Sequence, residues 1–135
     1  MAIGNYLIMV GSYKIPLEYM RQETYQITYS TLDLDSYRDA NGVLHRNALS
    51  HKVSKIEFNV PMMSMSKLQT LIKNITDNYV NATEKKVLVT YYNIETDSYL
   101  SQNMYVPDIP FTIRNADLAN GIVNMNETRI AFIGY

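Results

Sequence analysis

Hydrophobic and polar residues alternate along much of this chain, and a period of two residues is typical of β-strands. In residues 24–31 the side chains of Tyr25, Ile27 and Tyr29 fall on one face, and polar side chains fall on the other. Residues 53–60 repeat the pattern until a proline ends it. Both segments are rich in aromatic and β-branched residues, which favour strands. We therefore expect two strands, each with one apolar face.

Six further segments are expected as strands or strand pieces, because each is an apolar or alternating run between turn residues. They are residues 6–10, 14–17, 86–92, 99–106, 111–113 and 128–135. Pro16 has no amide hydrogen to donate, so the second of these is expected at a sheet edge. Turns are expected at Gly11–Ser12, at residues 93–97 and at Asn120–Gly121.

Residues 33–48 form a mostly polar segment with a hairpin signal at its centre. An Asn-Gly pair supplies the positive φ angles that tight hairpin turns require, and Asn41-Gly42 is such a pair. We expect a hairpin tip there, with arms at residues 36–38 and 43–46, projecting from the rest of the chain.

After residue 61 the apolar period changes from two residues to the spacing of a helix. The residues in this stripe are Met65, Leu68, Leu71, Ile72 and Ile75. They predict one amphipathic helix over residues 64–75. Ser66 with Gln69 fits a capping box at its start, and Ser64 is the rival N-cap. The stripe is interpreted as core rather than as a groove for a cofactor or a lipid.

Together these elements predict a mainly β fold. We expect an antiparallel β-sandwich or half-open barrel of about seven or eight strands, flanked by one α-helix. The chain has 135 residues and is 47% hydrophobic, which is enough for one domain with its own core over residues 1–135.

Composition excludes several classes of protein. With 12 Lys+Arg against 13 Asp+Glu, the chain lacks the basic surplus of a dedicated nucleic-acid binder. The absence of Cys excludes disulfides, a thiolate zinc site and a cysteine nucleophile. Charged residues are 19% of the chain and there are 12 Tyr, a combination that suits a surface kept for protein partners.

Signals for secretion and membrane insertion are weak. The start is apolar but lacks a basic n-region, and no stretch approaches the roughly 20 apolar residues that span a bilayer. We expect a protein that is not inserted in a membrane and that folds in a reducing cytoplasm.

Candidate catalytic and metal-binding residues do not form a convincing pattern. His45 and His51 lie near Asp33, Asp35 and Asp39, but neither the spacing of zinc ligands nor the ligand order of a calcium loop is present. Nucleophile elbows and glycine-rich phosphate loops are also missing. The residues Glu23, Glu57, Glu84, Glu95 and Glu127 are interpreted as solvated surface. We expect no catalytic residue, no cofactor and no metal; a small hydrolase would need a buried carboxylate pair.

Three parts of the chain have a familiar residue order. They are Tyr37–Arg46 followed by Lys52–Phe58, Val89–Asp97 followed by Met104–Asp108, and Gly121–Val123 with Arg129–Ile133 as a closing strand pair. In these segments the chain resembles an uncharacterised family of short proteins from the tail modules of long-tailed bacteriophages. Pro107 stands where that family usually has Gly.

The resemblance implies a tail-tube-like fold and a structural virion protein of the tail, at its tip or baseplate. Its partners would be copies of itself in a symmetric ring and other tail proteins, after assembly in the cytoplasm of the bacterial host. The residues expected at the subunit interface are Tyr37, Arg38, Asn41, Gly42, His45 and Arg46. Two alternatives stay open: a carbohydrate-binding β-sandwich module for host-surface recognition, and a tail assembly chaperone absent from the mature particle.

Overall fold

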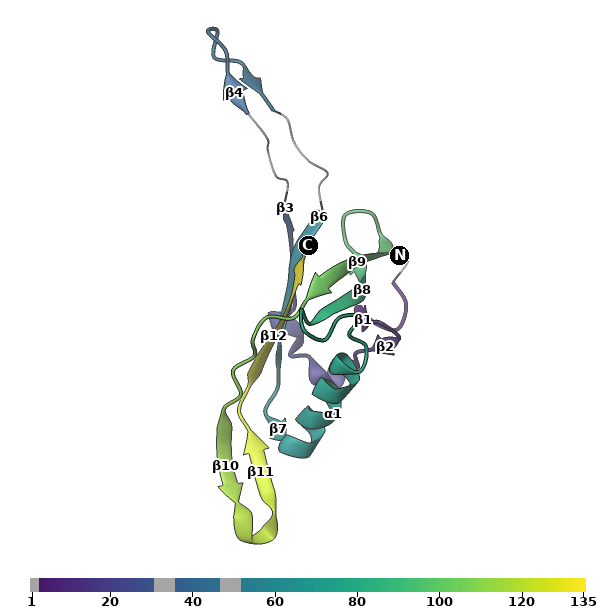
Figure 1. The fold of residues 1–135 in the computed structure, drawn as a ribbon, viewed down its shortest axis with the longest axis vertical. Helices are drawn as coiled ribbons and strands as arrows, with labels where there is room; N and C mark the ends of the chain where they lie inside the picture. The colour runs from purple at the N-terminus through teal and green to yellow at the C-terminus, as the bar shows by residue number, and fades with distance from the viewer. Residues whose placement is uncertain (1–2, 31–35, 47–51) are drawn as a thin grey trace.

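The computed structural model describes residues 3–30, 36–46 and 52–135 of the chain (Figure 1). Strands make up 46% of it, and the described part holds one α-helix. The largest sheet is antiparallel and seven-stranded, with the order β2-β1-β8-β9-β12-β6-β3. Its strands are β1 (Ile8–Val10), β2 (Tyr13–Lys14), β3 (Gln26–Ser30), β6 (Lys52–Val60), β8 (Lys86–Asn93), β9 (Ser98–Tyr105) and β12 (Thr128–Gly134).

The remaining elements are small. A three-stranded sheet has the order β10-β11-β7, and β4 pairs with β5 in a separate hairpin. Their bounds are β4 (Tyr37–Arg38), β5 (Leu44–His45), β7 (Met63–Ser64), β10 (Ile113–Asp117) and β11 (Ile122–Met125). The helix is α1 (Met65–Thr76), and the 3-10 turns are η1 (Leu17–Tyr19), η2 (Gln22–Thr24) and η3 (Leu118–Asn120).

The seven-stranded sheet consists of two well-paired parts that meet at a narrow seam. β8 and β9 pair over their whole length, and so do most of β12 and β6. By contrast, β12 pairs with β9 through Ile133↔Tyr105 and Gly134↔Met104 alone. The sheet is open and does not close into a barrel.

One hydrophobic cluster joins α1 to both parts of the sheet. Leu71 and Ile75 of the helix are buried in it with Val89 from one part and Phe58 and Phe132 from the other. The period-two pattern therefore has a simple physical reason, because alternate side chains of the strands enter this core. The prediction of a mainly β, antiparallel fold with one flanking helix is confirmed, and so is the edge position of the short strand before Pro16.

The start of α1 differs from the capping-box prediction. Ser64 is the N-cap, and its Oγ accepts a hydrogen bond from the Lys67 amide at 3.4 Å. Ser66 already lies inside the helix, because the chain turns into the helical conformation directly after β7. The capping box at Ser66 is therefore wrong, and the rival N-cap is confirmed.

Replacing Ser64 by Ala should lower the free energy of unfolding by about 0.5–1 kcal/mol, the low end for N-caps because the bond is long. Ser66→Ala is the matched control and should cost less, since Ser66 caps nothing. Urea denaturation of both variants measures the difference. A larger loss for Ser66→Ala than for Ser64→Ala would contradict the assignment.

The segment from residue 111 to residue 125 also differs from expectation. The expected strand piece at 111–113 begins at Ile113 and continues to Asp117, where it pairs with β11 in a hairpin. β11 pairs with β10 and β7, whereas β12 pairs with β6 and β9. The expected closing strand pair of residues 121–123 and 129–133 is thus wrong: both segments are strands, but they pair with other strands.

Two hairpins lie at opposite ends of the molecule in Figure 1. The β4–β5 hairpin is at one end, beyond β3 and β6, and the β10–β11 hairpin is at the other, beyond α1 and β7. Within residues 36–46, β4 and β5 pair as the arms of a hairpin where the sequence pattern placed one; its projection from the rest of the domain stays a prediction.

Candidate interaction surfaces

The β4–β5 hairpin closes through a loop with a left-handed glycine. The Asp39 amide donates to the Val43 carbonyl at 3.0 Å, and the Gly42 amide donates to the Asp39 carbonyl at 2.9 Å. Gly42 has a φ of 79°, whereas Asn41 is not among the residues with positive φ. The expected turn with two positive φ angles is therefore wrong; this is the longer hairpin loop in which one glycine takes the left-handed position.

The carboxylate of Asp39 holds this loop together. Its Oδ1 accepts from the amides of Asn41 at 2.9 Å and Val43 at 3.1 Å, and its Oδ2 lies 2.9 Å from Nε2 of His45. The contact with His45, followed by the backbone amides, lowers the pKa of Asp39 below its usual value. Sequence reasoning considered Asp39 as a metal ligand and missed this role, although an Asp two residues before Asn-Gly is a turn signal.

The structure brings the expected interface residues into two contacts on this hairpin. The Tyr37 ring stacks on the His45 ring at a centroid distance of 4.8 Å, and Arg38 Nη1 donates to the Gly42 carbonyl at 2.9 Å. All six expected interface residues are exposed, including Asn41 and Arg46. The hairpin is thus stabilised by its own contacts and presents polar and aromatic groups to solvent; its role as an interface stays a prediction.

The candidate metal ligands do not converge in the described part of the chain, which contains no group of three or more His, Asp or Glu side chains able to hold a metal ion. His45 pairs with one carboxylate, that of Asp39. His51, Asp33 and Asp35 lie outside the described residues.

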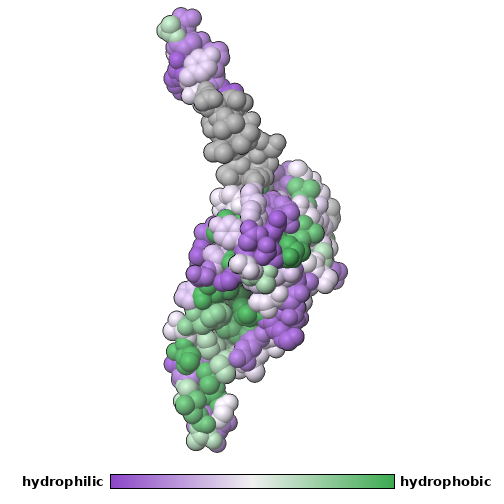
Figure 2. Space-filling view, in the orientation of Figure 1, coloured by the Kyte–Doolittle hydropathy of each residue, from purple (hydrophilic) through white to green (hydrophobic). Residues whose placement is uncertain are grey.

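A second surface, at the other end of the molecule, is apolar and was not expected. Residues 110–122 are all exposed, from the proline before β10 to the first residue of β11. We call β10, η3 and β11 (residues 113–125) the apolar hairpin; Figure 2 shows the hydrophobic colour gathered on this end. Its exposed large side chains, with Phe111 just before it, are Phe111 at 51%, Ile113 at 58%, Leu118 at 80% and Ile122 at 50%.

Such exposure is costly in water. Full burial of one large aliphatic or aromatic side chain contributes about 1.5–3 kcal/mol. Contiguous exposed apolar patches on soluble proteins commonly mark contacts with other molecules. The charged residues within the apolar hairpin are Arg114 and Asp117. Sequence reasoning missed the surface because residues 113–122 do not enter the core and lack a clean alternation.

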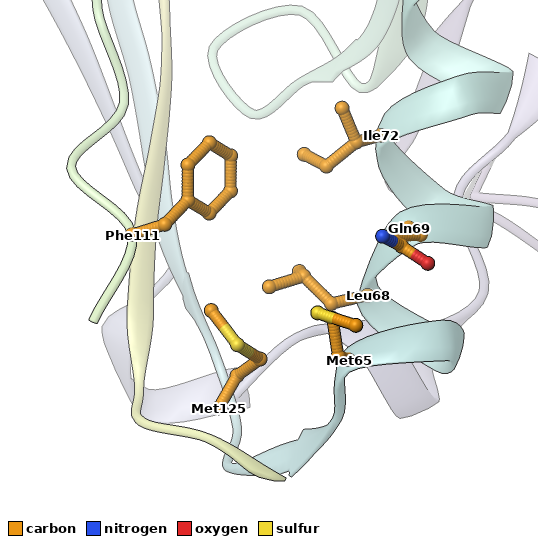
Figure 3. Close-up of a pocket in the computed structure, with 6 residues that line it drawn as sticks. All are labelled: Met65, Leu68, Gln69, Ile72, Phe111 and Met125. Carbon is orange, nitrogen blue, oxygen red and sulfur yellow. The ribbon is translucent and has the colours of Figure 1, made fainter. Parts of the chain in front are cut away.

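An apolar hollow of about 320 Å³ lies between the helix and the base of the apolar hairpin (Figure 3). We call it the helix groove. Leu68 and Ile72 on α1 face Phe111 and Met125 across it. The complete lining is Met65, Leu68, Gln69, Ile72, Phe111 and Met125.

The groove corrects the interpretation of the helical stripe as core. Leu68, Leu71 and Ile75 are buried, so the interpretation is right for them. Met65 is 36% exposed and Ile72 is half-buried, because these two side chains point toward the groove rather than into the core. The apolar arc of the helix is wider than the face that the sheet covers.

The described polar groups near the seam of the sheet bind one another. Tyr29 donates from Oη to Asn93 Oδ1 at 2.6 Å, and Tyr91 donates from Oη to Gln102 Oε1 at 2.9 Å. Gln102 in turn donates from Nε2 to the Val53 carbonyl at 2.8 Å. They line a hollow of about 470 Å³, and the Tyr29–Asn93 and Gln102–Val53 bonds each link the two parts of the sheet.

Among the described carboxylates, that of Glu57 is paired with two cations at the surface, Arg129 and Lys55. Burial alone would raise the pKa of Glu57, but hydrogen bonds from Arg129 and Lys55 hold it below its usual value. The pairing of Glu57 therefore stabilises the fold at pH values above 4.5, the ordinary pKa of this carboxyl group. The contribution is lost as the pH falls through the lower pKa of the folded state. The buried polar residues among those described are Asn93 and Thr128, so this part of the chain offers no buried carboxylate pair for a hydrolase.

Within residues 3–30, 36–46 and 52–135, no helix has the length and hydrophobicity to cross a membrane.

The fold and surfaces define a small, open-sheet β-protein with two exposed hairpins. The chain belongs to DUF6711, a family of unknown function, which it matches over residues 1–135. A comparison with curated proteins finds no match.

Among solved structures, the chain is similar to the sheath/tube terminator of an extracellular contractile injection system, PVC, seen by cryo-EM in its extended state. The two share 18% identity with a TM-score of 0.42, over 98% of this chain and 91% of that chain. The likeness is weak.

Proposed function

We propose that this protein is a non-enzymatic structural subunit of a bacteriophage tail, at the tail tip or baseplate. It assembles into a symmetric ring of its own copies and contacts other tail proteins. The observation that carries the proposal is the run of thirteen consecutive exposed residues, 110–122, with its large apolar side chains. The sequence resemblance to phage tail-module proteins is the reason for proposing a phage tail as the assembly that this surface joins.

The sheet edges support the same proposal. β3 lies at one end of the seven-stranded order and β10 at one end of the three-stranded order, so each has one neighbouring strand in the described part of the chain. An open edge carries unpaired amide and carbonyl groups, and it is an aggregation hazard unless another chain covers it. In a ring of identical subunits, strand edges of neighbouring copies can pair with each other.

The β4–β5 hairpin is proposed as a further contact of each subunit. Its Asp39-centred loop is fixed before any partner binds, which reduces the entropy lost on association. The six residues predicted for this contact offer a stacked aromatic pair, an exposed amide and two guanidinium groups. Tyrosine and arginine are among the residues enriched at protein interfaces.

Deletion of residues 39–43 tests the role of this hairpin. The deletion should leave a folded monomer, because the core lies elsewhere, but the variant should no longer join particles when it replaces the wild-type protein. Circular dichroism checks the fold, and immunoblots of purified particles check incorporation. Ile94→Ala, on the exposed turn between β8 and β9, is the control and should be incorporated normally. Normal incorporation of the deletion variant would overturn this role.

The two alternatives predict different results. A carbohydrate-binding module would bind specific glycans tightly on an array, and we expect no such binding. An assembly chaperone would be abundant in infected cells and absent from finished particles, whereas we expect the protein in the particles.

A further inference from the structure

We propose that the tip of the apolar hairpin of one copy inserts into the helix groove of a second copy of this chain. The inference rests on the proposed assembly into a ring, and it names the contact that joins neighbouring subunits. The β4–β5 hairpin is then free to contact other proteins of the tail.

The tip has the properties of an inserting element. Leu118 is 80% exposed, the highest value among the large hydrophobic side chains in the described part of the chain. Gly121 takes a φ of 66° to close the turn, and a side chain added there would meet nothing within 4 Å. The carboxylate of Asp117 accepts a hydrogen bond from Asn120 at 2.7 Å, so the charge nearest the tip has a partner within the hairpin.

The helix groove has the matching chemistry. Its lining is apolar except for the amide of Gln69, and it carries no charged side chain. A volume of about 320 Å³ lies at the lower end of the range for specific binding hollows, roughly 300–1,000 Å³. It is therefore suited to one large apolar side chain with a small neighbour, as Leu118 and Ala119 at the hairpin tip provide.

The tip cannot occupy the groove of its own chain. Phe111 and Met125, at the base of the hairpin, form one wall of that groove. β11 is fixed there by its register with β7, Met125↔Met63 and Asn124↔Ser64. A strand of five residues extends about 17 Å at roughly 3.4 Å per residue, so the tip lies well away from the groove at its base.

A second copy is the occupant that these features favour. Each copy carries both the projecting apolar tip and an apolar hollow, and the two surfaces are different patches of one molecule. Contacts between different patches of identical subunits are head-to-tail, and they generate rings when the rotation closes. Residues 118–121 carry no charged side chain, so inserting these four residues avoids the cost of placing a charge in an apolar groove.

Cysteine cross-linking tests the contact, because the native chain has no Cys and every disulfide must come from an introduced pair. Leu118→Cys and Gln69→Cys variants of the full chain are purified separately, mixed and oxidised mildly. We expect a disulfide-linked dimer that contains one copy of each variant, identified by mass spectrometry. The control mixture is Leu118→Cys with Ile94→Cys, whose side chain is 66% exposed but lies on the β8–β9 turn. Cross-linking at Gln69 no stronger than at Ile94 would overturn the inference.

A charge at the tip gives an independent readout. Leu118→Arg should weaken self-association by about tenfold or more in size-exclusion chromatography with light scattering, since it removes the burial of a leucine and inserts a charge. The fold should persist because the site is exposed, and Ile94→Arg should associate like wild type. Wild-type association of Leu118→Arg would contradict the contact.

The outcomes separate this inference from the proposed function. A specific 118–69 disulfide in a protein that never enters particles would support the contact and overturn the tail role. A second outcome combines two results: Leu118→Arg enters particles at wild-type levels, and the Leu118→Cys and Gln69→Cys mixture forms no specific disulfide. This outcome would support the tail role and overturn the contact.

Discussion

Replacing Phe132 by Ala should lower the free energy of unfolding by about 3–5 kcal/mol. Phe132 is fully buried on β12, in register with Ile56 of β6, and it belongs to the cluster that joins the sheet to α1. The loss combines the burial of the ring with the cavity left behind. Since small domains are stable by about 5–15 kcal/mol, the variant should unfold at a much lower urea concentration.

Phe111→Ala is the matched control, with the same chemical change at a side chain that is 51% exposed. It should cost about 1 kcal/mol, because about half of this residue is already in water. It should nevertheless weaken self-association, since Phe111 lines the helix groove. Equal stability losses for the two variants would contradict the separation of core from interaction surface.

Gly134→Ala should destabilise the protein by about 1–3 kcal/mol through crowding at the seam of the sheet. A methyl group at Gly134 would lie 2.8 Å from the Val53 carbonyl oxygen and 2.7 Å from Gln102 Nε2. The side chain of Gln102 can move, but the carbonyl belongs to β6 and cannot move without disturbing the sheet. The backbone of β12 must therefore shift at its C-terminal end, where it lies between β6 and β9.

Two further variants identify the cause. Gly134→Ala made in a Gln102→Ala background should still be destabilising, because the contact with the Val53 carbonyl persists. Gly4→Ala, which would contact Tyr99 Oη at an ordinary 3.4 Å, should be nearly neutral. Full rescue by Gln102→Ala would show that the seam does not depend on the glycine.

The sequence predicted those elements whose pattern is set by the core. β6 and β3 follow the period of two because alternate side chains face the hydrophobic cluster, and α1 follows the helical period for the same reason. The Gly42 turn was also predictable, because a left-handed position favours glycine whatever the rest of the fold. The β8–β9 pair could be placed from its turn residues.

The surfaces could not be predicted as well. Residues 113–122 of the apolar hairpin lie outside the core, so burial does not impose a period on them, and their apolar residues look like ordinary strand or loop residues. The helix groove depends on Phe111 and Met125 coming near α1, which are contacts distant in sequence. The N-cap was ambiguous between Ser64 and Ser66 because both have the right chemistry, and the place where β7 ends decides between them.

The measurement that tests the proposed tail role most directly is quantitative mass spectrometry of mature tailed particles, purified from cells that express this chain. We expect the protein in the particles, at a copy number in fixed proportion to the other tail proteins, as a ring requires. Its absence from particles, while it is abundant in the infected cells that produced them, would contradict the account.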